Sequence, residues 1–250
     1  MALRTLPETG LVTPDAADDV PWPWQLRQTL EEATGRSARK DPVTGRTGGA
    51  AGNARLTAWT GVLLLVLLAA EGITLLDVRG LIGWHVVIGA LLVPPALLKT
   101  ATTGWRIVRY YRGAAAYRAA GPPPMPLRVL GPLVVASTLA VLGTGVLVVL
   151  LGSQRGREPL WGTPISALFL HQASFVVWLA ATTLHVLGRV VPAVNIITGR
   201  VAAHAVAGRL ARTAAVLVVA GLATWLAFVL YAAVPGWQHD FPIRQFRDGG

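Results

Sequence analysis

Five long apolar runs dominate this chain and constrain its fold more than any other feature. Each run holds about twenty predominantly apolar residues, the length of helix that crosses a hydrocarbon core of about 30 Å. Because a lipid core offers no water to backbone polar groups, each run is predicted to be an α-helix. The sequence therefore predicts an all-α membrane protein with five transmembrane helices. The runs extend from about 57 to 76, 81 to 102, 129 to 151, 165 to 187 and 214 to 234.

Composition narrows the classes of site that the chain can hold. The chain contains no cysteine, which excludes disulfides, thiolate metal sites and cysteine-ligated iron–sulfur clusters. The formal net charge is +10, although only 14% of the residues are charged. These charges gather in the segments beside the apolar runs, so membrane topology explains them better than binding to nucleic acid. We expect no nucleic-acid partner.

The chain divides into three predicted regions. Residues 1–56 are polar and lack the continuous apolar core of a signal peptide, so we expect a retained and mostly disordered segment. A short helix from about Trp22 to Thr34 is compatible with this segment. Residues 57–234 are the predicted transmembrane bundle, in which four of the five helices are expected to surround a cofactor. Residues 235–250 form a C-terminal tail.

Arginine distribution predicts the orientation in the membrane. The segment after the second run carries five arginines and no acidic residue, and the segment after the fourth run carries four arginines and no acidic residue. Segments rich in Lys and Arg stay on the cytoplasmic side. We therefore predict a multi-pass protein of the cell membrane, with a cytoplasmic N-terminus and an extracytoplasmic C-terminus.

Three histidines within the apolar runs are the candidate ligands of a cofactor. His171 and His185 are fourteen residues apart in the fourth run, so at about 100° per residue they share nearly one helix face. His85 and His171 each lie near the start of parallel runs, at matched depth near the outer surface. Two neutral imidazoles from facing helices can ligate the iron of a b-type haem (heme b). The alternative is that each histidine is a polar residue that forms hydrogen bonds inside the bundle.

A second haem near the inner surface is less well supported by the sequence. Lys99 stands fourteen residues after His85, at the position expected to face His185. A lysine amine can bind iron only after it loses a proton, and the alternative is that Lys99 extends to the lipid headgroups. In that case His185 is structural, or contacts a quinone or a haem propionate. We expect one haem and leave a second site at His185 and Lys99 open.

Two further features bear on this predicted site. Glu71 lies in the first run at the depth of His85, and isolated carboxylates in membranes are functional candidates. We expect Glu71 to take part in proton handling beside a quinone site, with an interfacial residue that reaches water as the alternative. Gly131, Gly143 and Gly145 in the third run permit close approach of a flat macrocycle, or simply of another helix.

The sequence around these histidines resembles the cytochrome b membrane subunits of formate dehydrogenases and nickel–iron hydrogenases, and the wider bacterial cytochrome b561-like group. The resemblance rests on Gly-Trp-His at 83–85 and Phe-Leu-His-Gln at 169–172, with His185 as the second histidine of the fourth helix. In the formate dehydrogenase pattern the partner of His185 falls around Trp59 or Thr60. In the cytochrome b of respiratory complexes it falls at Lys99. Neither position holds a histidine.

This resemblance implies a function in respiratory electron transport. It implies that the chain exchanges electrons between a membrane quinone and an extracytoplasmic oxidoreductase subunit, for which a molybdopterin-dependent protein is one candidate. The sequence contains no catalytic constellation, so we expect an electron-transfer subunit rather than a catalytic chain. A membrane anchor without haem and a small transporter remain the alternatives.

Overall fold

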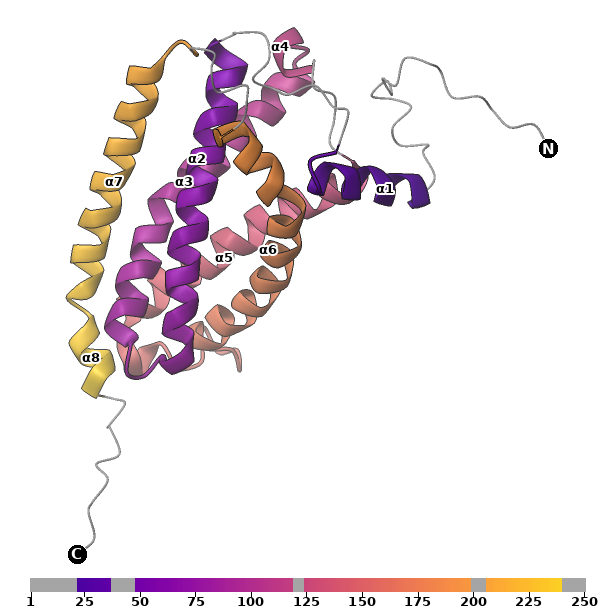
Figure 1. Ribbon diagram of the computed structural model, residues 1–250. Helices are drawn as coiled ribbons and strands as arrows, with labels where there is room; N and C mark the ends of the chain where they lie inside the picture. The colour runs from indigo at the N-terminus through magenta and orange to yellow at the C-terminus, as the bar shows by residue number, and fades with distance from the viewer. Residues whose placement is uncertain (1–21, 37–47, 119–123, 199–205, 240–250) are drawn as a thin grey trace, which may run out of the picture. The chain divides into compact units, whose positions relative to one another are not determined.

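The computed structural model describes residues 22–36, 48–118, 124–198 and 206–239, and these ranges are almost entirely helical (Figure 1). No strand occurs within them, apart from one isolated bridge between Pro159 and Ser166. The elements in chain order are α1 (Trp22–Ala33), α2 (Gly48–Thr74), the 3₁₀ turn η1 (Leu75–Asp77), α3 (Ile82–Tyr111), α4 (Ala115–Arg118), α5 (Met125–Arg155), α6 (Ala167–Thr198), α7 (Arg209–Tyr231) and α8 (Val234–His239).

Five of these helices are long and apolar enough to cross a membrane, which confirms the predicted all-α membrane protein with five transmembrane helices. They are α2, α3, α5, α6 and α7. Each covers all or nearly all of one predicted apolar run and extends beyond it into a polar flank. Helix α2, for example, begins at Gly48 rather than near Thr57. The flanks contain alanine and arginine, which favour helix, so the helix does not end where the apolar run ends.

Helix α1 lies within the segment 1–56 that was expected to be mostly disordered. Its bounds match the short helix that the sequence allowed from about Trp22 to Thr34. Residues 48–56 of that segment are also helical and belong to α2. Residues 1–21 and 37–47 lie outside the described residues, as does most of the tail 235–250.

Internal contacts divide the chain into two compact units. Unit 1 comprises Met1–Ala58, Thr102–Leu133 and Thr183–Arg209. Unit 2 comprises Trp59–Ala101, Val134–Thr182 and Leu210–Gly250. Helices α2, α3, α5 and α6 each contribute one portion to each unit, and the two units are described separately below.

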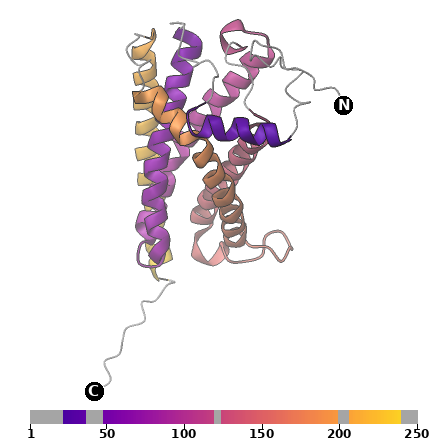
Figure 2. The same cartoon turned by 45° about the vertical axis from the view of Figure 1, so that its right-hand side comes forward.

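The core of unit 2 is built from small apolar residues on α3 and α7. Val86 and Ala90 of α3 pack against Ala227 and Leu230 of α7, and Val234 of α8 joins this cluster. Alanine at this interface allows two helix backbones to approach closely, which is how membrane helices pack without a hydrophobic driving force between them. Figures 1 and 2 show α2, α3 and α7 side by side.

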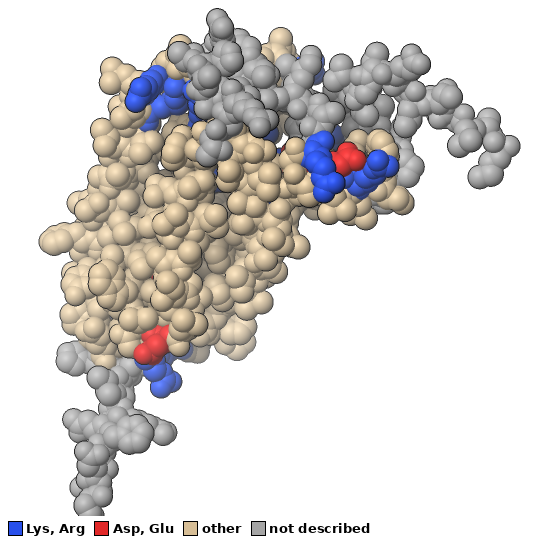
Figure 3. Space-filling model, viewed as in Figure 1, with Lys and Arg blue, Asp and Glu red and all other residues tan. Residues whose placement is uncertain are grey.

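The outward face of α7 has the composition expected for contact with lipid. Leu217, Val218, Trp225 and Phe228 are between 61% and 80% exposed. Contiguous exposed apolar side chains of this size are uncommon on soluble monomers. In Figure 3 the visible surface along the helices is free of charged side chains, and Lys, Arg, Asp and Glu lie near helix ends and on α1.

Candidate functional site

The first half of the site is His85, near the start of α3, which faces the last turns of α2. Its Nδ1 lies 3.0 Å from Oε1 of Glu71 and 2.9 Å from Oγ1 of Thr74. The turn between the helices sets this geometry, because Oδ1 of Asp77 accepts a hydrogen bond of 3.0 Å from the amide of Gly80. The chain therefore reverses within a few residues, and α3 returns beside α2.

The contacts of His85 identify which ring nitrogen carries the proton. The Thr74 hydroxyl donates its single proton to the carbonyl of Glu71, at 2.6 Å. It can then only accept from His85. The Nδ1 of His85 is therefore the donor to Thr74, and Oε1 of Glu71 lies 3.0 Å from the same nitrogen. In a neutral ring the lone pair then remains on Nε2.

The second half of the site is His171, in the first turns of α6, which faces α5. Its Nδ1 lies 3.0 Å from the backbone carbonyl oxygen of Val141. A carbonyl only accepts, so Nδ1 carries the proton here as well. Thr144 lies 3.3 Å from the same nitrogen and donates to the carbonyl of Ala140 at 2.6 Å. A neutral His171 therefore also keeps its lone pair on Nε2.

The structure brings the two histidines together, as the sequence predicted. Their ring centres are 6.3 Å apart and their planes are inclined at 74°. The exposed fractions of the His85 and Glu71 side chains are 20% and 15%. All these residues belong to unit 2, and they come from α2, α3, α5 and α6. Four helices thus converge on one pair of imidazoles.

Glycine determines how closely α5 approaches His171. A Cβ added at Gly145 would lie 3.0 Å from Cε1 of His171, which is closer than nearly all real contacts of that kind. Gly143 and Gly131, the other two glycines singled out in the sequence, would meet no atom within 4 Å. Of the three glycines, only Gly145 lies against the site.

Glu71 occupies a more specific position than the sequence predicted. Its carboxylate lies against a candidate ligand through Oε1, whereas Oε2 is buried and has no hydrogen-bond partner among the described residues. A Cβ at Gly89 would lie 3.5 Å from Oε1, so the carboxylate also packs closely on the α3 backbone. Glu71 is therefore placed to orient His85.

The sequence does not predict the contacts that Thr74, Thr144 and the carbonyl of Val141 make with the two rings. Only Thr74 carries a sequence signal, because it lies three residues after Glu71 and therefore on a neighbouring part of the same helix face. The Val141 carbonyl carries no sequence signal. Every helical residue has such a carbonyl, and only the packing of α5 against α6 selects this one.

The predicted inner site at His185 and Lys99 is not tested by the geometry. Nζ of Lys99 lies 2.8 Å from the position that a Cβ would take at Gly61, so the Lys99 side chain packs onto α2 within unit 2. His185 belongs to unit 1. The pairing of His185 with Lys99 joins residues of different units and stays a prediction.

Comparisons with known proteins do not identify the chain. No protein-family model, curated protein or solved structure matches it. Among the described residues, no cluster of three or more His, Cys, Asp or Glu side chains could hold a metal ion. A haem with two axial histidines does not require such a cluster, because the macrocycle supplies the other ligands to iron.

Proposed function

We propose that this chain is a membrane cytochrome b-type electron-transfer subunit in which His85 and His171 are the axial ligands of one b-type haem. The observation that carries the proposal is that both rings are anchored through Nδ1 and keep Nε2 for a metal. Histidines that bind metals almost always donate their other ring N–H to a carboxylate, a backbone carbonyl or water. His85 has the first kind of partner and His171 the second.

The spacing of the rings also fits this cofactor. An imidazole nitrogen binds a transition metal at about 2.0 Å, so two rings on opposite sides of one iron have centres roughly 6 Å apart. The observed separation is 6.3 Å. Each ring plane contains its own bond to the metal, so ligation leaves the angle between the planes unconstrained, and 74° is compatible with it.

The surrounding residues have separate roles in this proposal. A bound haem supplies a one-electron redox centre within the membrane. Glu71 and Thr74 hold the ring of His85, and the Val141 carbonyl holds the ring of His171. Gly145 allows α5 to lie close enough for that last hydrogen bond. His185 and Lys99 take other roles, such as contact with a quinone or with lipid headgroups.

The proposed partners follow from the proposed orientation. With the arginine-rich segments in the cytoplasm, His85 and His171 lie toward the extracytoplasmic side. Electrons then pass between the membrane quinone pool and an extracytoplasmic oxidoreductase subunit, for which a molybdopterin-dependent protein stays a candidate. The chain is a carrier, and the substrate chemistry belongs to that subunit.

A visible spectrum of the purified full chain tests this function. We expect the reduced-minus-oxidised difference spectrum to show the bands of a low-spin b-type haem, because two imidazoles give a strong axial field. A membrane anchor without cofactor and a small transporter would both purify without these bands. Their absence after expression with sufficient haem supply would overturn the proposal.

A further inference from the structure

Helix α1 belongs to unit 1, in which it packs against the C-terminal part of α6. The Glu32 carboxylate forms an ion pair with the Arg189 guanidinium, and Glu32 is only 7% exposed. Gly35 follows the helix at a φ of +71°, and a Cβ there would lie 3.0 Å from side-chain atoms of both Val191 and Asn195. The C-terminal end of α1 is therefore fixed against α6 at two points.

The buried face of α1 is polar, and an exposed face is apolar. Gln25 and Glu32 are buried, and at about 100° per residue they lie about 20° apart around the helix. Leu26 and Leu30 lie on a different side and are 53% and 65% exposed. This arrangement is the reverse of that of a helix on a soluble protein, which buries its apolar face.

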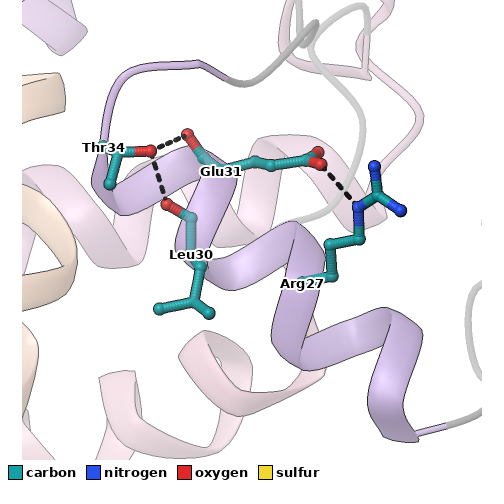
Figure 4. Close-up of polar contacts among 4 residues, drawn as sticks. All are labelled: Arg27, Leu30, Glu31 and Thr34. Atoms are coloured by element: carbon teal, nitrogen blue, oxygen red, sulfur yellow. Dashed lines mark hydrogen bonds and ion pairs between the residues drawn. The ribbon is translucent and has the colours of Figure 1, made fainter.

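A third side of α1 carries charge. Nε of Arg27 lies 3.0 Å from Oε1 of Glu31, and the Arg27 guanidinium lies 5.5 Å from the ring centre of Trp24. In Figure 4 the side chain of Leu30 points away from this ion pair, while Thr34 donates hydrogen bonds to the carbonyls of Leu30 and Glu31. The helix thus separates a protein-bound side, an apolar side and a charged side.

The charge of unit 1 indicates what covers the apolar side. Its described residues include ten arginines and two glutamates, and both glutamates are paired with arginine. Such an excess is complementary to anionic lipid headgroups, which attract basic side chains near the membrane surface. The arginines are Arg27, Arg36, Arg55, Arg106, Arg109, Arg112, Arg118, Arg128, Arg189 and Arg209.

The direction of α1 is also that of a helix at a membrane surface. In both ribbon views the axis of α1 is transverse to that of the first turns of α2, which belong to the same unit (Figures 1 and 2). We propose that α1 is an interfacial helix that inserts Leu26 and Leu30 into a leaflet of anionic lipid. Arg27 and Glu31 then face water, and Trp24 lies beside Arg27 on the same charged side.

Spin labels can test this placement directly, because the chain has no native cysteine. The full chain is reconstituted in phosphatidylcholine vesicles that contain phosphatidylglycerol, with a nitroxide at either Leu30→Cys or Glu31→Cys. Oxygen concentrates in lipid, whereas a charged nickel chelate stays in water. We expect the ratio of oxygen to nickel collisions to be several-fold higher at position 30 than at position 31. A label at Phe228→Cys, on the exposed face of α7, gives the reference for lipid contact.

The outcomes separate lipid from the other occupants of this face. A label at position 30 that is as open to nickel as the label at position 31 places α1 in water and overturns the proposal. A label shielded from both reagents shows that protein covers the face, and overturns it too. A repeat at Leu26→Cys guards against a local effect of one label. In vesicles of phosphatidylcholine alone we expect the label at position 30 to lie less deep in the membrane, with a lower ratio of oxygen to nickel collisions. An unchanged ratio would exclude recognition of anionic headgroups.

Discussion

Oε1 of the Glu71 carboxylate lies 3.0 Å from Nδ1 of His85, whereas the equivalent nitrogen of His171 donates to a neutral backbone carbonyl at 3.0 Å. The two proposed ligands therefore differ in the group that lies against Nδ1, which is a carboxylate for His85 and a neutral carbonyl for His171. A charged acceptor makes an imidazole a stronger electron donor than a neutral acceptor does, because it withdraws the ring proton more effectively. His85 is thus the ligand whose properties the protein can adjust through a side chain.

Replacement of Glu71 should change the proposed haem in two separable ways. Glu71→Gln keeps an acceptor but removes the charge, so the midpoint potential should rise while haem content is retained. Glu71→Ala removes the acceptor, and loss of such a partner typically costs 10–100-fold in metal affinity. Redox titration and haem quantification measure the two effects. Thr74→Val, which leaves the carboxylate on His85, is the control and should shift the potential less. An unchanged potential in Glu71→Gln would exclude this role.

Gly145 should be intolerant of even one additional methyl group. A Cβ at this position would lie 3.0 Å from Cε1 of His171, so Gly145→Ala should displace the ring or α5 and lower haem content. Overpacking of this kind typically costs about 1–3 kcal/mol. Gly143→Ala lies on the same helix, two residues away, and would meet nothing within 4 Å. Equal haem content in the two variants would show that close packing at His171 is not required.

The number of haems per chain decides the role of Lys99 and His185. We predict one haem, because an ammonium has no lone pair for iron and the arginine-rich flank disfavours another charge inside the bundle. Lys99→Met and His185→Ala should therefore leave the spectrum of the purified chain unchanged. A stoichiometry near two, with loss of one haem in Lys99→Met, would instead establish a second site between these residues.

The orientation can be tested independently of any cofactor. Reporter fusions after Gly121 and after Gly250 should report opposite compartments, with Gly121 in the cytoplasm, because an arginine-rich segment surrounds Gly121. Alkaline phosphatase and a fluorescent protein active only in the cytoplasm form a suitable pair of reporters. The same compartment for both fusions would contradict the predicted orientation.

The sequence predicted the five membrane helices because length and hydropathy alone define what can cross a bilayer. It also predicted that His85 and His171 meet, because both lie a few residues into parallel helices. It did not predict the ends of the helices, since the 3.6-residue turn continues through polar flanks that favour helix. Helix α2 therefore begins nine residues before its apolar run.

The hydrogen bonds that orient the two rings were harder to predict. Thr74 and the carbonyl of Val141 matter only because particular helices pack together, and packing between small residues leaves little trace in hydropathy. Glu71 was recognised as a site residue through its isolation in an apolar run. Its contact with His85 depends on the tight turn at Asp77 and Gly80, which returns α3 beside α2.

Loss of the haem spectrum on removal of one proposed ligand tests the central claim most directly. His171→Ala is expressed beside His204→Ala, a histidine outside the apolar runs, and folded protein is quantified for both by size-exclusion chromatography. We predict that His171→Ala loses most of its b-type haem while His204→Ala keeps it. Full haem content with an unchanged spectrum in His171→Ala would contradict the assignment of His85 and His171 as axial ligands.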